Sequence, residues 1–472
     1  MRSFSSLLTA AVAFATAVFA APTITHDKRS MVERDGVVYN VFEHAATGAR
    51  IEFVNNSGIC ETTPGVNQYS GYLSVGTNMN MWFWFFEARQ NPSTAPLAAW
   101  FNGGPGCSSM IGLFQENGPC KFKVGSSNTT PVNNTYSFNN YANMLYVDQP
   151  IGVGFSYGTD DVTSTETAAP YVWKLIQAFY SSFPQYKSRD FGIFTESYGG
   201  HYGPEFAKYI QDQNTAGKGE KINLVALGVN NGWFDAEIQE PQYIQFSYNN
   251  TYKPLISQSQ YNSYMSKFKS SCLPQIQQCK SSGSNSACQN ADRACNNAIE
   301  GPLTNSGDFD VYDIRAPSND PEPPQNYVKY LTTASVVKAI GAKSTYQECP
   351  DAPYNKFAST GDGPRSFLDE LSSVVSTNLT TIVWAGDADW ICNWFGNLAV
   401  ANVVDYPGNA AFASKALAPY KVNGKEGGQF KTEGNLSFLR VYAAGHEVPY
   451  YQPELALQVF IQTMKKGAIQ ST

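Results

Sequence analysis

Histidine and charge are both scarce in this chain. Only 4 of the 472 residues are histidines, so a metal site built from several imidazoles has little to work with. Charged residues make up 15%, and 39 acidic against 32 basic residues give a formal net charge of −7. Nucleic acids and anionic membranes require clustered Lys and Arg, so this balance argues against both as partners. No apolar run after the N-terminus is typical of a membrane span, and we expect no membrane or lipid anchor.

Apolar material is abundant by contrast. Hydrophobic residues make up 42% of the chain and aromatic residues 14%, which excludes intrinsic disorder and predicts a large buried core. The length is compatible with two or three domains, although α/β enzymes of this size often have one core.

The first 20 residues have the features of a secretory signal peptide. Arg2 is followed by an apolar run over residues 7–19, too short to cross a bilayer, and residues 18–20 offer small side chains before a cut at Ala21. Lys28-Arg29 is either a processing site, which would make residues 21–29 a short pro-segment of a zymogen, or ordinary surface charge. We therefore expect a secreted, extracellular protein rather than a vacuolar one.

Secretion gives meaning to the cysteines and to the glycosylation motifs. Disulfides persist outside the cytosol, and nine cysteines leave at least one without an intramolecular partner. Six Asn-x-Ser/Thr sequons are candidate glycosylation sites, and not every one need be used. They lie at Asn55, Asn128, Asn133, Asn249, Asn378 and Asn435.

Short apolar runs rich in β-branched or aromatic residues predict six buried strands. These runs are residues 97–101, 144–147, 191–194, 222–229, 381–384 and 438–442. Apolar residues between Ala169 and Phe179 recur at helical spacing, with Thr163 and Glu166 as the expected cap and Pro184 as the end. Alternating strands and helices predict an α/β fold with a mostly parallel central sheet covered on both faces.

Residues 236–349 differ in character, because Ser, Asn, Gln and Tyr crowd this segment and no strand–helix alternation is visible. It holds Cys272, Cys279, Cys288 and Cys295. Low complexity is one explanation, but clustered cysteines in a secreted chain favour a disulfide-stapled insertion. We predict a cap at 236–349, inserted into an α/β core formed by residues 30–235 and 350–472.

Ser197 is the candidate nucleophile. It follows an apolar strand at a tight turn, and residues 204–211 are expected to form the next helix, which is the context of a nucleophile elbow. The motif departs from G-x-S-x-G because Thr195 stands at its first position. Taken alone, a serine at this point could equally be a helix cap.

A serine nucleophile needs a base and an orienting acid. His446 follows the last predicted strand, whereas His201 lies one helical turn after Ser197 and is expected to point along its own helix. Asp387 and Asp389 both follow the strand at 381–384 and are both candidate acids. The order Ser, Asp, His, with each residue after a strand, is that of an α/β-hydrolase.

The glycine-rich loop at residues 102–109 follows the first predicted strand, where hydrolases supply an N–H to the oxyanion. A Gly-Pro turn and a phosphate loop are the alternatives. The phosphate loop lacks support, because no Lys-Ser/Thr pair follows the glycines.

These motifs together resemble the serine carboxypeptidase family, and especially its secreted fungal members. The resemblance rests on Asn102-Gly103-Gly104-Pro105-Gly106-Cys107-Ser108-Ser109, Asp148-Gln149-Pro150 with residues 152–156, Glu196-Ser197-Tyr198, and Gly445-His446 with Val448-Pro449. It implies an α/β-hydrolase fold, no cofactor or metal, and release of C-terminal amino acids from peptides and proteins at acidic pH through an acyl-enzyme. The family tolerates Thr at position 195.

The resemblance also implies roles for individual residues. Ser197 corresponds to the nucleophile, His446 to the base and Asp389 to the acid, because the family's acid lies three residues before a cysteine, here Cys392. The N–H groups of Gly104 and Tyr198 correspond to the oxyanion hole. The substrate's terminal carboxylate is expected to bind to Asn102, Glu116 and Glu196, with Trp100 and Gly103 beside them.

The implied disulfides are Cys60–Cys120, Cys107–Cys349, Cys272–Cys295 and Cys279–Cys288. Cys392 then remains a free thiol, either sensitive to mercurials near the site or a buried apolar filler. No interface for an oligomer can be identified.

Two acidic side chains can hold a carboxylate only when they are protonated, so peptide affinity should fall as pH rises. An esterase or acyltransferase, and a non-catalytic adhesion or chaperone protein, are the competing functions. The binding constellation disfavours the former, and the complete triad disfavours the latter. Glu447, beside His446, either receives a basic residue of the substrate or is simply solvated.

Overall fold

The computed structural model describes residues 27–44, 50–125 and 130–472. The predicted signal peptide, residues 21–26 of the predicted pro-segment and the sequon at Asn128 lie outside these ranges. Lys28-Arg29 begins a paired strand, and the Arg29 guanidinium donates to the Ser182 carbonyl and lies over the Phe42 ring.

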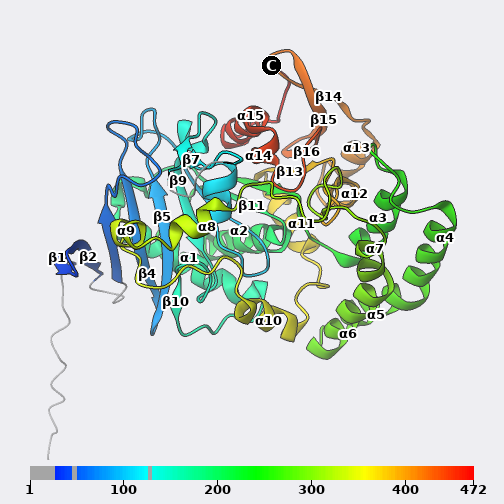
Figure 1. The fold of residues 1–472 in the computed structure, drawn as a ribbon, viewed down its shortest axis with the longest axis horizontal. Helices are drawn as coiled ribbons and strands as arrows, with labels where there is room; N and C mark the ends of the chain where they lie inside the picture. The colour runs from blue at the N-terminus through cyan, green and yellow to red at the C-terminus, as the bar shows by residue number, and fades with distance from the viewer. Residues whose placement is uncertain (1–26, 45–49, 126–129) are drawn as a thin grey trace, which may run out of the picture.

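A 14-stranded sheet runs through the molecule (Figure 1) in the order β1-β2-β3-β4-β5-β9-β6-β11-β12-β13-β16-β15-β14, with β10 paired to β5. The strands are β1 (Lys28–Arg34), β2 (Val37–Glu43), β3 (Arg50–Asn55), β4 (Gln68–Gly76), β5 (Met79–Phe86), β6 (Leu97–Phe101), β9 (Asn143–Asp148), β10 (Tyr157–Gly158), β11 (Phe191–Glu196), β12 (Leu224–Asn230), β13 (Thr380–Gly386), β14 (Ala418–Val422), β15 (Lys425–Glu433) and β16 (Leu436–Val441). A separate small ribbon pairs β7 (Cys120–Lys121) with β8 (Val132–Asn133).

The six predicted strands are the parallel centre of this sheet, β9-β6-β11-β12-β13-β16. Alternate residues of each strand point to opposite faces. Along β6, Leu97, Ala99 and Phe101 enter one core cluster and Ala98 and Trp100 the other. Both faces of the parallel centre are therefore buried, and the predicted α/β-hydrolase class is confirmed.

Helices cover these two faces. Those on the first include α1 (Thr165–Ser182), α2 (Gly199–Thr215) and α11 (Leu368–Ser376), and those on the second include α15 (Pro453–Met464). The remaining helices are α3 (Ala236–Asn249), α4 (Gln258–Lys267), α5 (Leu273–Ser282), α6 (Asn285–Cys295), α7 (Gly301–Thr304), α8 (Asn326–Leu331), α9 (Ala334–Ile340), α10 (Asp351–Thr360), α12 (Trp394–Val403), α13 (Asn409–Ser414) and α14 (Val448–Tyr451).

Two helix predictions are wrong in detail. The cap of α1 is Ser164, whose hydroxyl accepts from the Thr167 N–H while the Thr167 hydroxyl accepts from Ser164, so Thr163 and Glu166 are not the capping pair. Helix α2 begins at Gly199 rather than at Pro204, which lies inside the helix.

The segment between β12 and β13 is helical. Helices α3 to α7 lie together at one end of the molecule (Figure 1) and share a hydrophobic cluster with Trp390. The disulfides Cys272–Cys295 and Cys279–Cys288 join the helices of this cluster. That residues 236–349 form a cap with these limits stays a prediction.

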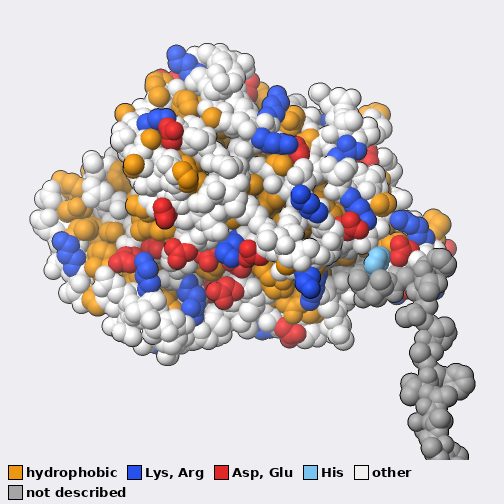
Figure 2. Space-filling model, turned by 180° about the vertical axis from the view of Figure 1, so that it is seen from behind, with side chains coloured by type: hydrophobic (Ala, Val, Ile, Leu, Met, Phe, Trp, Pro, Cys, Tyr) orange, Lys and Arg blue, Asp and Glu red, His pale blue; other side chains and the backbone are white. Residues whose placement is uncertain are grey.

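Two further disulfides, Cys60–Cys120 and Cys107–Cys349, complete the four pairs that the resemblance implies, and Cys392 is a buried free thiol. Within the described ranges no helix has the length and hydropathy needed to span a bilayer. Figure 2 shows Lys and Arg side chains scattered among Asp and Glu on one face, without a broad basic surface on the described part of it.

Candidate active site

Ser197 lies in the sharp turn from β11 into α2. Its φ of 62° is in the left-handed region, which costs a non-glycine residue free energy and is typical of a strained functional turn. A Cβ on Gly199 would lie 2.5 Å from the Thr195 Cβ, so glycine here makes room for the threonine that breaks the expected motif. A Cβ on Gly103 would lie 2.4 Å from the Tyr198 nitrogen, so the glycine-rich loop packs directly on this turn.

His446 and Asp389 form a buried pair. The His446 Nδ1 lies 2.9 Å from the Asp389 Oδ2, and the same carboxylate accepts from the Asn231 side chain at 2.6 Å and from the N–H groups of Ile391 and Cys392. Burial lowers the pKa of His446, but the charges of Asp389 and Glu196 outweigh it and hold the pKa above its usual value. This arrangement can hold the imidazole in one orientation and stabilise its protonated form.

Asp387, the competing acid, is occupied elsewhere. Its carboxylate accepts from Arg440 at 3.0 Å and from the Ala443 N–H at 3.0 Å. The geometry therefore separates the two candidate acids, because Asp389 alone of the two meets a histidine.

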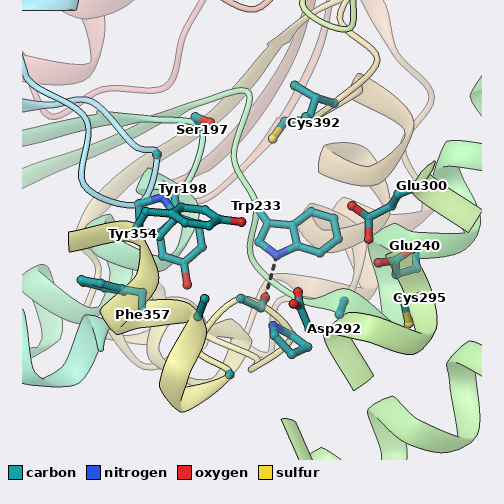
Figure 3. A pocket seen from close by; sticks show the side chains of 18 of the residues that line it. Ser197, Tyr198, Trp233, Glu240, Asp292, Cys295, Glu300, Tyr354, Phe357 and Cys392 are labelled. Carbon is teal, nitrogen blue, oxygen red and sulfur yellow. Dashed lines mark hydrogen bonds between the residues drawn. The ribbon is translucent and has the colours of Figure 1, made fainter. Parts of the chain in front are cut away.

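The Ser197 side chain faces the Cys392 thiol (Figure 3), and the described residues show no hydrogen bond between Ser197 and His446. Catalytic hydrogen bonds are often long in ligand-free enzymes and tighten when substrate binds. Burial and the Asp389 charge raise the pKa of Cys392 well above its usual value, so its sulfur is a thiol rather than a nucleophilic thiolate.

Two backbone N–H groups near Ser197, those of Gly104 and Tyr198, can donate to a substrate oxygen. Neither the Gly104 N–H nor the Tyr198 N–H donates to a partner within the described part of the chain. Gly104 has a φ of 111°, which a side chain would strain. Paired N–H groups of this kind can receive the oxygen of a tetrahedral intermediate.

Beside this pair lies a buried cluster of acids and amides. The Asn102 amide donates to Glu116 and to Glu196 at 3.1 Å each, while its oxygen accepts from the Trp100 indole and the Gly112 N–H. Burial, followed by the charges of Glu196 and Glu447, raises the pKa of Glu116 well above its usual value. Burial likewise raises the pKa of Glu196. Glu116 and Glu196 also form a side-chain hydrogen bond with each other, which requires a proton on one of the two carboxyl groups, so the cluster can offer a proton to an anion.

Glu447 is half-buried in the same pocket as Asn102, Glu196 and His446, and its Oε2 is buried with no hydrogen-bond partner among the described residues. Burial, Glu196 and Glu348 raise its pKa well above the usual value. One carboxyl oxygen of Glu447 is therefore buried in the pocket wall, and the role of this residue stays a prediction.

Sequence reasoning missed two residues. Asn230 donates to the Glu196 Oε2 and to the His446 carbonyl, both at 2.9 Å, and Asn231 orients Asp389. Both stand at the carboxyl end of β12, between the strands that carry Ser197 and Asp389, and that position was the available signal.

His201 is buried, with its Nδ1 2.6 Å from the Trp233 carbonyl, which places it apart from the nucleophile.

Ser197 lies where two pockets meet. The first holds aromatic side chains on one side and Glu240, Asp292 and Glu300 on the other (Figure 3). The second is lined by Asn102 and Glu196 of the acid–amide cluster and by His446 and Glu447. One possible metal-ligand group, Glu240 with Cys272 and Cys295, occurs among the described residues, but the disulfide between its cysteines leaves it no thiolates.

An α/β-hydrolase core with a Ser, His and Asp constellation defines a serine hydrolase. The serine carboxypeptidase profile matches residues 58–466, and the chain belongs to this family. It is a serine-type exopeptidase that releases C-terminal amino acids, and the resemblance stated from the motifs is confirmed.

The chain is 69% identical to Carboxypeptidase S1 of Penicillium janthinellum over 425 residues, which span 89% of this chain and 100% of that protein. It is 37% identical to Carboxypeptidase Y of Schizosaccharomyces pombe, over 84% of this chain and 40% of that protein. Among solved structures, the prohormone-processing carboxypeptidase Kex1(Δ)p of Saccharomyces cerevisiae has the same fold, with a TM-score of 0.73, 23% identity, and coverage of 84% of this chain and 90% of that chain.

Proposed function

We propose that the enzyme cleaves the last peptide bond of its substrate through an acyl-enzyme on Ser197. The observation that carries this proposal is the Asn102–Glu116–Glu196 cluster, which can receive a terminal carboxylate beside a serine elbow and a His446–Asp389 pair. Without such a site, the same triad would serve an esterase equally well.

In the first half-reaction the Ser197 Oγ attacks the carbonyl carbon as its proton moves to the His446 Nε2. The carbonyl oxygen becomes an oxyanion and accepts from the Gly104 and Tyr198 N–H groups. When the C–N bond breaks, the departing amine takes the proton from His446. Water then attacks the acyl-enzyme with His446 again as base and frees the shortened peptide.

The carboxylate site accounts for cleavage at the C-terminus only. Protonated Glu116 and Glu196 can donate to the substrate carboxylate, whereas the ionised forms would repel it. Because the pKa of each is raised, this donor state persists to higher pH than in water, but it is lost as pH increases further. We therefore propose an acidic working range, limited at its lower end by protonation of His446.

A blocked dipeptide and its C-terminal amide test this function. The free acid should be hydrolysed at acidic pH and the amide far more slowly. A serine-directed organophosphate should label the wild-type enzyme but not Ser197→Ala. Equal rates on acid and amide would favour an esterase, and activity of Ser197→Ala would exclude the acyl-enzyme.

The biological setting is also a proposal. Residues 1–20 would direct secretion, and removal of residues 21–29 would mature a zymogen. Among the sequons, Asn55, Asn133, Asn249 and Asn378 are exposed, which supports their glycosylation. The half-buried Asn435 donates to two carbonyls and is a poor acceptor.

A further inference from the structure

The hydroxyl of Tyr198 makes a hydrogen bond outside the catalytic machinery. Its backbone N–H is the oxyanion donor proposed above, and its side chain donates at 2.8 Å to the Oδ2 of Asp362. Burial and the charge of Asp362 raise the pKa of Tyr198 well above its usual value, so the phenol keeps its proton. The side chain of the residue that carries an oxyanion donor is therefore fixed by a buried hydrogen bond.

Burial and further hydrogen bonds fix the position of the Asp362 side chain. It is fully buried, and its Oδ2 also accepts from the Thr165 N–H at 3.1 Å and from the Thr165 hydroxyl at 2.7 Å. Thr165 is the first residue of α1, which packs on the central sheet. The Tyr198 side chain is thus anchored to a rigid element, which limits how far its peptide unit can turn.

The segment that carries Asp362 also reaches the other oxyanion donor. It begins at Cys349, whose disulfide to Cys107 fixes the glycine-rich loop of Gly104. Between these ends, the Phe357 ring of α10 packs at 6.1 Å from the Tyr198 ring. Residues 349–362 therefore span both halves of the oxyanion hole.

We propose that Asp362 is a positioning residue for catalysis, which acts through the Tyr198 hydroxyl to aim the Tyr198 N–H at the oxyanion. This inference rests on the oxyanion hole of the proposed function. Ser197 occupies a strained turn, and without this anchor the peptide unit that follows it can relax. Displacement of about 1 Å at a reacting centre costs about 10²-fold in rate, so a partial shift should cost about tenfold.

The test compares Tyr198→Phe, Asp362→Asn and the double variant on one blocked dipeptide. Tyr198→Phe should lower kcat about tenfold with KM within about twofold, because the oxyanion contact is made mainly in the transition state. Inhibition by a peptide aldehyde, which forms a tetrahedral adduct with the serine, should weaken by the same factor. Asp362→Asn should add almost nothing in the Tyr198→Phe background.

Tyr186→Phe is the matched control, because Tyr186 is another buried tyrosine that donates to a carboxylate, that of Glu87 at 2.9 Å. It should lower Tm without changing kcat or aldehyde affinity. The proposal is overturned if Tyr198→Phe behaves like Tyr186→Phe, or if Asp362→Asn lowers kcat equally in both backgrounds. Activity of Ser197→Ala would instead overturn the proposed function, so the two failures are distinguishable.

Discussion

Both pockets that meet at Ser197 have buried acidic side chains beside them, but the hydrogen-bond donors to these acids differ between the two pockets. In the second pocket, amides of Asn102 and Asn230 donate to Glu116 and Glu196. In the first pocket, the buried Glu240 and Glu300 carboxyl groups form a hydrogen bond with each other, and no amide side chain of the described residues donates to either of them. Amide donors fix a binding geometry, whereas an unsupported acid pair stores an electrostatic cost that a cation can relieve.

The largest effect should come from the second pocket. Glu116→Ala should lower kcat/KM for a free-acid dipeptide about 10²–10³-fold, because it removes a charge-assisted donor and leaves the cluster incompletely paired. Hydrolysis of the C-terminal amide should change much less. Glu300→Ala, an acid removed from the other pocket, should not reproduce this difference between acid and amide. If both substrates lose activity equally, the cluster does not bind the carboxylate.

The pH dependence of KM for the free-acid dipeptide tests whether the second pocket binds the carboxylate through a protonated acid. Above the raised pKa of Glu116, KM for the free acid should increase by up to about tenfold per pH unit, as the donor proton is lost. Glu116→Gln keeps a permanent donor and should flatten this rise. A wild-type KM that is constant from acidic to neutral pH would contradict the assignment.

The first pocket should control selectivity for the residue before the scissile bond. Burial raises the pKa of Glu300 to about 7, so the pocket gains negative charge as pH passes through neutrality. Glu300→Gln should reduce the kcat/KM ratio of Lys over Leu substrates about tenfold at pH ~7.5 and hardly at pH ~5. Glu447→Gln, in the other pocket, should leave this ratio unchanged. If the Lys-over-Leu ratio is unchanged in Glu300→Gln, the first pocket does not control selectivity for the residue before the scissile bond.

The smallest effect concerns stability. The pKa of Glu240 is raised in the folded protein, chiefly by burial, so folding becomes less favourable as pH rises above the unfolded carboxyl pKa of about 4.3. Glu240→Gln should therefore raise Tm by about 1–2 °C at neutral pH and leave it unchanged near pH ~4. Calorimetry at both values measures this, and a lower Tm at neutral pH would show that the carboxylate is paired.

The sequence predicted the central sheet well, because strands of a parallel sheet are buried on both faces and appear as continuous apolar runs. The triad was predictable because each member follows such a strand. Asn230 and Asn231 could not be predicted as site residues, because asparagine after a strand is also typical of an ordinary turn. Asp362 was missed because its partners, Thr165 and Tyr198, are distant in sequence. The burial of one Glu447 carboxyl oxygen could not be predicted, because the surrounding pocket rather than the local sequence buries it.

The Cys107–Cys349 disulfide spans 242 residues of sequence and has a consequence for cleaved forms of the enzyme. A protease that cuts in the helical segment between β12 and β13, before Cys349, divides the chain into one fragment with Ser197 and another with Asp389 and His446. The bridge keeps these two fragments covalently joined. Such an enzyme would migrate as one species on a non-reducing gel and as two after reduction, with the halves of its catalytic triad on separate polypeptides.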